Sequence, residues 1–522
     1  MKKIIESIYS INLEGNRLKK LALLSVSDKS GLVPFATNLV ELGYSLLATG
    51  GTAKMIAEAG IEFTGVEEYA SFPEIFSGRV KTLQPKIFGG ILMRRDNESD
   101  KSEAVANDVL PIDIVCVNLY PFPEVVKRSD IELPEKIENI DIGGPSLIRA
   151  AAKNYKYVSV LTNPNQYDNF ISELEIGAVS LATRETLASR AFSHTSYYDT
   201  LIADYFESQF NVEKDAIRLN YPLKNKLRYG ENPHQEAFIA GDFYEYFDVL
   251  HGKELSYNNI VDLVAAVDLV NELDPVSCAI IKHTNAAGAA TSDNVLEAYT
   301  NALSGDPVSA FGGIVSFNTK VDLATAEKLN EIFLEIIVAP EFDDDALEVL
   351  KKKKNRRLLK EIKKSNDDKI LVKNIPGGVI AQSIDDSKGS DLNLEVVTDV
   401  KPEDTQLEDL KFAWTLCKHT KSNAIVYVKN KKLLGAGAGQ MSRLDSSNIA
   451  AMKAKEHGHN IVGAVAASDA FFPFADGLLA IADSGITAVI QPGGSVRDEE
   501  VIAAANNRKI AMLFTGIRNF KH

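Results

Sequence analysis

The first half of the chain repeats one pattern: a short apolar run, a loop rich in Gly, Ser, Thr or Asp, and a helix-forming segment. The run 21–26 leads through Ser27–Gly31 into a helical pattern, and the run 44–48 leads through 49–52 into another. Further apolar runs recur at 112–118 and 157–161. Strands that alternate with helices form a parallel sheet with helices on its faces. We therefore expect an α/β fold.

The second half reads as α/β too, with helical patterns at 260–273 and 406–416 and a Gly-marked strand at 310–315. A basic run, 351–364, is interpreted as a solvated face or connector. The tract from Pro376 to Asp404 is interpreted as a loop.

At 522 residues the chain is too long for a single core. A proline and a basic cluster at 221–226 interrupt a helical pattern and indicate the main boundary near 212–226. We expect an N-terminal extension at 1–19, a domain at 20–215, a linker at 216–226, and a region at 227–522 made of two related units, about 227–400 and 401–522.

Composition excludes several classes of protein. The net charge of −15 argues against a broad nucleic-acid surface. No run of roughly 20 apolar residues or signal peptide is found, so we expect neither a membrane span nor export. The three cysteines, Cys116, Cys278 and Cys417, form no CxxC and lie among apolar residues, so we expect buried thiols, no metal site, and a cytoplasmic location.

Loops of the first half that follow strands should gather at the carboxyl edge of the sheet. Thr49-Gly50-Gly51-Thr52 offers backbone N–H groups and a helix N-terminus suited to phosphate, although Thr52 could simply cap the helix. It is not a P-loop, because GxxxxGK[ST] is absent. The ionisable candidates for binding an anion and moving protons are Arg79, Lys81, Tyr120, Asp141 and Lys153.

In the second half, the apolar run 279–281 ends in Lys282 and His283. Lysine supplies a cation, and histidine can move protons near neutral pH. The alternative is a strand end whose polar residues merely meet water. The letters Lys-His-Thr recur at 418–420, which suggests an internal duplication.

Ordered motifs along the chain identify a family. They are Ser25–Lys29, Arg79–Leu83, Asn118–Phe122, Asp141–Gly144, Ala151–Asn154, Leu227–Gln235, Lys282-His283, Lys421–Asn423, Gln440–Arg443 and Asp469–Phe474. From about residue 20 to its end, the chain closely resembles the bifunctional purine-biosynthesis family in which AICAR transformylase is joined to IMP cyclohydrolase.

The resemblance implies a methylglyoxal-synthase-like first half and two cytidine-deaminase-like units in the second. It implies formyl transfer from 10-formyltetrahydrofolate to AICAR and closure of the product, FAICAR, to IMP. It further implies a homodimer whose transformylase sites span the interface. With the charge, the lack of an apolar span and the missing zinc ligands, we expect no catalytic metal and neither nucleic-acid nor membrane partners.

The resemblance also implies roles for individual residues. The transformylase catalytic residues would be Lys282, His283 and Asn423. The cyclohydrolase catalytic residues would be Lys81, Tyr120, Asp141 and Lys153. AICAR would be held by Arg228, Tyr229, Asn259, Gly312, Glu335, Arg443 and Arg518, and folate by Phe471, Asp476, Ser495 and Val496. The nucleotide of the cyclohydrolase would be held by Ser27, Asp28, Lys29, Thr49, Gly50, Gly51, Thr52, Arg79, Thr82 and Asn118.

Two positions depart from the family pattern: Gln84 and Asn519 stand where members often have histidine. Two other functions were weighed. A zinc deaminase would need a PCxxC ligand pair, which is absent. A non-catalytic nucleotide or folate regulator would not need the Lys-His pair or the proton-moving residues of the first half.

Overall fold

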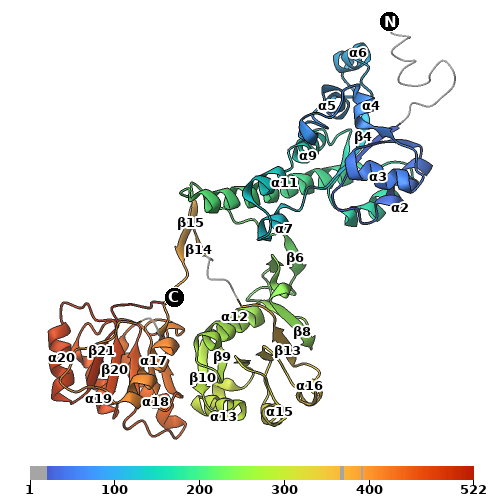
Figure 1. Cartoon of the computed structure of the whole chain (residues 1–522). Helices are drawn as coiled ribbons and strands as arrows, with labels where there is room; N and C mark the ends of the chain where they lie inside the picture. The colour runs from blue at the N-terminus through green and yellow to red at the C-terminus, as the bar shows by residue number, and fades with distance from the viewer. Residues whose placement is uncertain (1–19, 365–369, 390–391) are drawn as a thin grey trace. The chain divides into compact units, whose positions relative to one another are not determined.

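The computed structural model describes residues 20–364, 370–389 and 392–522 (Figure 1). The chain divides into two compact units, which meet in sequence at Pro222 and Leu223. The extension predicted at 1–19 lies outside the described residues. In the part of the chain that is described, no helix is long and apolar enough to cross a membrane.

The first unit is built on a five-stranded sheet. Its strands are β1 (Lys20–Ser25), β2 (Tyr44–Ala48), β3 (Thr64–Gly65), β4 (Ile112–Val117) and β5 (Ser159–Leu161). They are ordered β3-β2-β1-β4-β5 and all pair in parallel, as predicted. The chain progresses outward from β1 on one side and from β4 on the other, so the direction of the sheet order reverses between β1 and β4. Ligands of such sheets bind at this switch point, outside the carboxyl ends of the strands.

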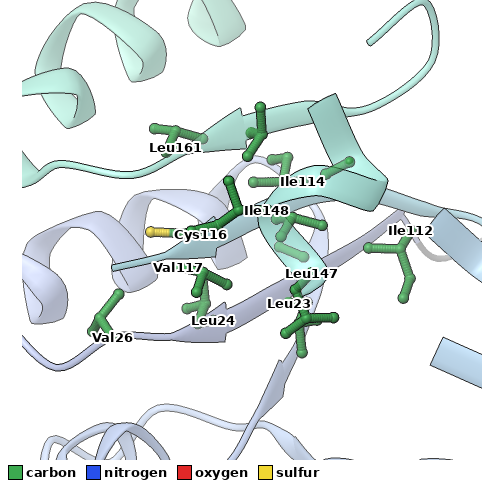
Figure 2. Close-up of a cluster of buried hydrophobic side chains, with 14 of the residues drawn as sticks. Leu23, Leu24, Val26, Ile112, Ile114, Cys116, Val117, Leu147, Ile148 and Leu161 are labelled. Carbon is green, nitrogen blue, oxygen red and sulfur yellow. The ribbon is translucent and has the colours of Figure 1, made fainter. Parts of the chain in front are cut away.

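Helices cover this sheet, so its strands are apolar on both faces. Figure 2 shows Leu23 and Leu24 of β1 packed with Val117 of β4 and with Leu147 and Ile148 of a helix. The helices are α2 (Leu32–Glu41), α3 (Gly50–Glu58), α4 (Val66–Ala70), α5 (Pro85–Leu92), α6 (Glu98–Ala106), α7 (Phe122–Lys127), α8 (Leu133–Glu138), α9 (Gly143–Lys153), α10 (Tyr167–Glu175) and α11 (Leu181–Phe210), with 3-10 turns η1 (Phe76–Gly78) and η2 (Pro164–Gln166).

The second unit contains two six-stranded mixed sheets. The first has β8 (Phe247–His251), β9 (Ser277–Lys282), β10 (Asn285–Thr291), β11 (Ile314–Phe317), β12 (Ile336–Ala339) and β13 (Arg357–Glu361). The second has β16 (Glu395–Val396), β17 (Ile425–Val428), β18 (Leu433–Gly437), β19 (Val465–Ser468), β20 (Ala488–Gln491) and β21 (Ala511–Phe514). Two hairpins stand apart, β6 (Leu223–Lys226) with β7 (Phe238–Ala240) and β14 (Ile370–Ile375) with β15 (Gly378–Ser383).

The two sheets have the same strand order and the same strand directions. The first is ordered β10-β9-β11-β12-β13-β8 and the second β18-β17-β19-β20-β21-β16. In each, three neighbouring strands are parallel and the remaining pairings are antiparallel. The duplication that the sequence suggested is therefore confirmed at the level of topology.

Helices flank both sheets. In chain order they are η3 (Phe243–Glu245), α12 (Tyr257–Glu272), α13 (Val295–Gly305), α14 (Pro307–Ala310), α15 (Leu323–Leu329), α16 (Asp344–Lys351), α17 (Asp404–Lys418), α18 (Arg443–Glu456), α19 (Ala475–Asp483) and α20 (Asp498–Asn507).

The correspondence between the two halves extends to single residues around the first hairpin of each sheet. Asp262 on α12 accepts hydrogen bonds from the backbone N–H groups of His283 and Thr284, at 3.2 and 2.8 Å. Asp409 on α17 accepts them from Asn430 and the next residue, at 2.8 and 2.6 Å. Positions 262 and 409, and 283 and 430, are both 147 apart. Each half thus holds its hairpin turn with one helical carboxylate.

The recurring Lys-His-Thr letters do not mark equivalent positions. Lys282 ends strand β9, whereas Lys418 ends helix α17. The structural counterpart of Lys282 is Lys429, because Lys282 Nζ donates to the Gly312 carbonyl at 2.8 Å and Lys429 Nζ donates to the Val462 carbonyl at 2.7 Å. The duplication is real, but the three letters that suggested it match by coincidence.

Three segment predictions were wrong in part. Ala310 ends α14, so the strand predicted at 310–315 begins only at Ile314. Residues 357–361, within the basic run, form strand β13, and Leu358 and Leu359 are fully buried. Residues 378–383 form β15 where a loop was expected.

Candidate functional site

Asn118 ties together two loops at the switch point of the first unit. It follows β4, and its side-chain oxygen accepts hydrogen bonds from the backbone N–H groups of Ser27 and Asp28, at 2.6 and 2.8 Å. Its side-chain N–H donates to the Asp28 carbonyl at 3.0 Å. The loops after β1 and β4 are therefore fixed against each other where a ligand of this fold binds.

The loop after β2 is fastened to the same place. The Thr52 hydroxyl accepts from the Val26 N–H at 2.9 Å and donates to the Val26 carbonyl at 3.1 Å. The alternative that Thr52 simply caps the helix is wrong, because Thr49 is the N-cap residue, Thr52 lies inside α3, and no side chain caps this helix. The Thr49 hydroxyl is buried and has no hydrogen-bond partner among the described residues. A buried hydroxyl without a partner is costly unless a ligand completes it.

Two lysines converge on the glycines between these threonines. A Cβ atom on Gly50 would lie 3.2 Å from Lys81 Nζ, and one on Gly51 would lie 3.5 Å from Lys29 Nζ. Gly50 has φ of +55°, a conformation that favours glycine. Two ammonium groups beside the N-terminus of α3 are chemically suited to an anion, because the helix dipole and both cations favour negative charge there.

Asp141 lies at the entrance to α9. Its carboxylate accepts from the Gly144 N–H at 2.8 Å and also receives a hydrogen bond from the Tyr120 backbone. Its own N–H donates to the Tyr198 hydroxyl at 2.8 Å. Burial raises the pKa of Asp141, and the two backbone hydrogen bonds oppose that rise only in part. The carboxyl group lies beside the backbone of Tyr120, whose side chain is half exposed.

Thr82 packs against the same helix entrance, because a Cβ on Gly143 would lie 2.5 Å from its hydroxyl. Sequence reasoning missed two residues here. Glu74 forms an ion pair with Lys81 at 2.8 Å, and Tyr198 supports Asp141 from the long helix α11. Neither belongs to a motif, and the contact between Tyr198 and Asp141 joins positions 57 residues apart.

The structure does not bring every predicted cyclohydrolase residue together. Arg79 is exposed and pairs with Glu138. Lys153 ends α9, ten residues from Gly143, which separates the two by about 15 Å along the helix. Lys153 instead lines a cavity of about 770 Å³ whose other walls include Phe88 and Phe192.

In the second unit, Lys282 and His283 stand at the tight turn between β9 and β10. Lys282 Nζ donates to the carbonyls of Gly312 and Phe311, at 2.8 and 3.4 Å. His283 has φ of +50°, and the Asp262 carboxylate holds the turn through two backbone N–H groups. The lysine ammonium keeps one hydrogen for another acceptor, and the imidazole is exposed.

The segment that contains Asn423 and leads into the second sheet contacts this turn. The Lys421 N–H donates to the Asn285 side chain at 3.0 Å, which joins the segment before β17 to the first residue of β10. The N–H and the side chain of Asn423 both donate to the Gln440 carbonyl, at 3.1 and 2.9 Å. The two duplicated halves therefore meet beside the Lys282 turn.

Buried Asn259 and half-buried Glu335 form a polar pair at the same edge of the first sheet. Asn259 Nδ2 donates to Glu335 Oε2 at 2.7 Å. Arg357 begins the neighbouring strand, and its N–H donates to the Glu335 carbonyl at 2.9 Å. Burial lowers the pKa of Arg357, while the charge of Glu335 raises it. These residues lie at the same strand ends as Gly312, since β11, β12 and β13 all begin at the edge where β9 ends.

Arg443 and Arg518 converge on one aromatic ring in the second half. Both guanidinium groups lie over Phe520, at 5.8 and 4.5 Å from the ring centroid. Arg443 also donates to the fully buried carboxylate of Asp469 at 3.0 Å. Paired guanidinium groups of this kind suit a phosphate or a carboxylate.

The remaining predicted residues make mostly local contacts. Phe471 lies two residues beyond Asp469, and Asp476 accepts a hydrogen bond from the Gly477 N–H at 2.7 Å in the first turn of α19. The Ser495 N–H donates to Asp498 at 3.1 Å, and the side chain of Val496 is fully exposed. Arg228 stacks on its neighbour Tyr229 at 5.6 Å in the segment between β6 and β7.

Two models of known protein families match most of the chain. A family model described as "AICARFT/IMPCHase bienzyme" matches residues 151–453, and one described as "MGS-like domain" matches residues 31–146. A solved structure titled "Crystal structure of ForH" is 37% identical, covers 36% of this chain and 100% of its own, and has a TM-score of 0.33.

Curated relatives match almost end to end. "Bifunctional purine biosynthesis protein PurH" of Persephonella marina is 50% identical, over 96% of this chain and 99% of the relative. The proteins of the same name from Bacillus cereus and Chlorobium phaeobacteroides are 47% and 48% identical, over 97% and 96% of this chain. The chain therefore belongs to the AICARFT/IMPCHase bienzyme family, and it is an AICAR formyltransferase and IMP cyclohydrolase of purine biosynthesis.

Proposed function

We propose that formyl transfer takes place at the Lys282 turn, with 10-formyltetrahydrofolate as the donor. The 5-amino nitrogen of AICAR attacks the formyl carbon, and His283 accepts the proton that this nitrogen loses. The remaining N–H of Lys282 stabilises the oxyanion of the tetrahedral intermediate. Collapse of the intermediate expels N10 of tetrahydrofolate, which takes up a proton. Asn423 helps to orient the reacting groups.

One observation carries this proposal: Asp262 and the carbonyls of Phe311 and Gly312 fix a lysine beside His283, whereas the equivalent contacts of the second half hold Lys429 beside an asparagine. A catalytic cation is effective when its position is fixed before the charge develops. A strand end that merely meets water gives no reason for a lysine and a histidine to stand together on only one of the two equivalent turns. The pair Asn259–Glu335 and the arginines Arg443 and Arg518 would bind AICAR, with Arg228, Tyr229 and Gly312 as further contacts.

We place the folate at Phe471, Asp476, Ser495 and Val496, and no step of the mechanism requires a metal. Several apolar side chains near the proposed site are uncovered, notably Phe311, Met441 and Val496. We propose that a second copy of the chain covers them in a homodimer. Light scattering after gel filtration tests this, and a monomer at assay concentration would contradict it.

We propose further that residues 20–215 are the cyclohydrolase domain and 227–522 the transformylase region, joined by 216–226. In the first, the FAICAR carboxamide nitrogen attacks the formyl carbon, and water leaves after proton transfers through Asp141 and Tyr120. Lys29 and Lys81 hold the phosphate beside Thr49–Thr52, with Ser27, Asp28, Thr82 and Asn118 around it. Arg79 would have to leave its ion pair with Glu138 to contribute. The partnerless hydroxyl of Thr49 supports a ligand at this loop.

Lys153 is not assigned a proton transfer, because it ends α9 far from Asp141. We propose a role for it in binding within the cavity of Phe88 and Phe192, and leave the proton transfers to Asp141 and Tyr120.

The test supplies purified protein with AICAR and 10-formyltetrahydrofolate and follows IMP by chromatography. Formation of IMP that survives a chelator supports the proposal. If FAICAR and IMP both fail to appear, this folate is not the donor; if a chelator abolishes them, a metal takes part.

A further inference from the structure

A buried ionic cluster joins the two duplicated halves of the second unit. Glu272 is the last residue of α12, Lys418 is the last residue of α17, and His419 follows it. Lys418 Nζ donates to both oxygens of Glu272 at 2.9 Å and to the Ser387 carbonyl at 2.7 Å. His419 Nε2 lies 3.1 Å from Glu272 Oε1. The side chains of Lys418 and His419 are 5% and 10% exposed, and that of Glu272 is 24% exposed.

Helix stability does not explain this cluster. A carboxylate at a helix C-terminus opposes the helix dipole. Burial raises the pKa of Glu272, but the contacts with His419 and Lys418 outweigh that effect and hold the pKa below its usual range. Burial also lowers the pKa of His419. Buried ion pairs contribute little net stability compared with apolar side chains of similar size, and their attested use is to fix one arrangement over others.

The Glu272 cluster fixes the position of the segment 418–423 relative to the Lys282 turn. From Lys418 and His419 the chain runs directly into Lys421, whose N–H binds Asn285 beside the turn, and then into Asn423. The intervening Ser422 exchanges two hydrogen bonds with the backbone of Lys521, at 2.9 and 3.0 Å. The Glu272 cluster therefore holds the N-terminal end of the segment that contains Asn423.

The C-terminal segment is anchored at the same place. Burial lowers the pKa of Lys521, and the charges of Asp268 and Glu272 oppose that effect. Asn519, which stands where relatives were expected to have histidine, is buried and donates to Asp385 at 2.7 Å and to Ser387 at 3.3 Å. Arg518, the proposed phosphate ligand, immediately precedes these anchored residues.

The duplication explains why the cluster lies at this junction. Glu272 and His419 are 147 positions apart, the same separation as the other equivalent residues, so equivalent helix ends contact each other here. The site beside this junction takes Lys282 and His283 from one half and Asn423 from the other. The mutual position of the halves must therefore be held accurately, because small misplacements of reacting groups cost large factors in rate.

We propose that Glu272, with Lys418 and His419, is a positioning residue of formyl transfer that sets the distance between Asn423 and the Lys282 turn. This rests on the proposed roles of Lys282, His283 and Asn423. Glu272 touches no reacting atom and acts only through the segment that Lys418 and His419 begin.

The test is a double-mutant cycle on the full chain, with FAICAR cyclisation as an internal measure of active protein. Glu272→Gln is expected to lower kcat for formyl transfer about tenfold or more, while KM for AICAR changes less than about threefold. If Glu272 acts through Asn423, Glu272→Gln in an Asn423→Ala background adds no further loss. Losses that multiply would overturn the proposal, as would a change confined to KM.

The same cycle distinguishes a failure of the positioning role of Glu272 from a failure of the proposed role of Asn423 in formyl transfer. If Asn423→Ala transfers formyl groups at the wild-type rate, the proposed role of Asn423 fails. If Asn423→Ala is impaired and Glu272→Gln is not, only the positioning role fails.

The matched control is Lys431→Met. Lys431 also joins the halves, through Asp274 at 2.9 Å, but beside the turn of the second sheet. Its loss is expected to leave formyl transfer within about twofold of wild type. Should Glu272→Gln fail to fold, the double variant Glu272→Met/Lys418→Met replaces the pair with apolar side chains and keeps the packing. Folded protein with full formyl transfer would overturn the proposal.

Discussion

Lys282 and Lys429 provide a comparison at the scale of single residues. Lys282 ends β9 and Lys429 follows β17, the equivalent strand of the second sheet, and each donates to a backbone carbonyl. They differ in their neighbours, because Asn430 stands where the first half has His283, and Val276 stands where the second half has Asn423. Only one of the two equivalent edges has the groups for proton transfer.

This difference predicts the outcome of two matched substitutions. Lys282→Ala is expected to lower formyl transfer by about 10²–10³-fold, as the loss of one oxyanion donor does elsewhere. Lys429→Ala removes the same backbone contact and is expected to change the rate by no more than about twofold. Steady-state formyl transfer measures both. Equal losses in the two variants would mean that Lys282 acts by holding its loop and not by chemistry.

Asp141 provides a second prediction at this scale. Burial raises its pKa, so the folded state binds the proton more tightly than the unfolded chain. This cost to stability is absent well below the unfolded value, grows as the pH rises from there through the folded pKa, and is complete above it. Asp141→Asn keeps an acceptor for the Gly144 N–H and removes the cost.

The variant Asp141→Asn should therefore unfold at a higher temperature than wild type at pH 7, with the difference vanishing toward pH 3. Its cyclisation rate should fall by about 10²–10⁴-fold, the contribution of a general acid or base. Calorimetry across pH and FAICAR turnover check the two parts. Lower stability at pH 7 would show that the ionised carboxylate is well accommodated in the folded state.

At the scale of elements, the duplication depends on close contact between a strand and a helix in each half. A Cβ on Gly288 of β10 would overlap the Ala302 carbonyl of α13, and one on Gly435 of β18 would overlap the Ala450 carbonyl of α18. Positions 288 and 435 are again 147 apart. Backbone cannot move aside as a flexible side chain can.

Gly288→Ala and Gly435→Ala are therefore each expected to destabilise the second unit by about 1–3 kcal/mol. Gly378→Ala, in the β15 hairpin strand, is the control, since a Cβ there meets nothing within 4 Å. Thermal unfolding of the three variants compares them. Neutral substitutions at 288 and 435 would indicate that strand and helix can separate without loss.

Elements could be predicted where the pattern of apolar and polar residues matched the burial of the element in the fold. Strands at 44–48 and 112–117 are apolar runs that end in polar loops, and both exist. Strand β13 could not be predicted, because Arg357 and Lys360 flank its two buried leucines and give the segment the look of a charged connector. Helix α12 was predicted, but the role of Asp262 on it was not, since its partners are backbone groups of residues 283 and 284.

At the scale of the whole molecule, two sets of site residues lie in different compact units. Lys81 and Asp141 belong to the first unit, and Lys282 and His283 to the second. Within the described residues, the contacts that position each set come from its own unit. The two activities should therefore be separable by single substitutions.

Lys282→Ala is expected to lose formyl transfer and to cyclise supplied FAICAR at close to the wild-type rate, while Lys81→Ala does the reverse. Mixing the two variants with AICAR and 10-formyltetrahydrofolate should restore IMP formation after a lag, because FAICAR released by one variant reaches the other through solution. The lag should shorten as the concentration of Lys282→Ala rises. A variant that loses both activities while folded would refute two independent sites. Intact single activities without IMP in the mixture would mean that FAICAR does not pass freely between molecules.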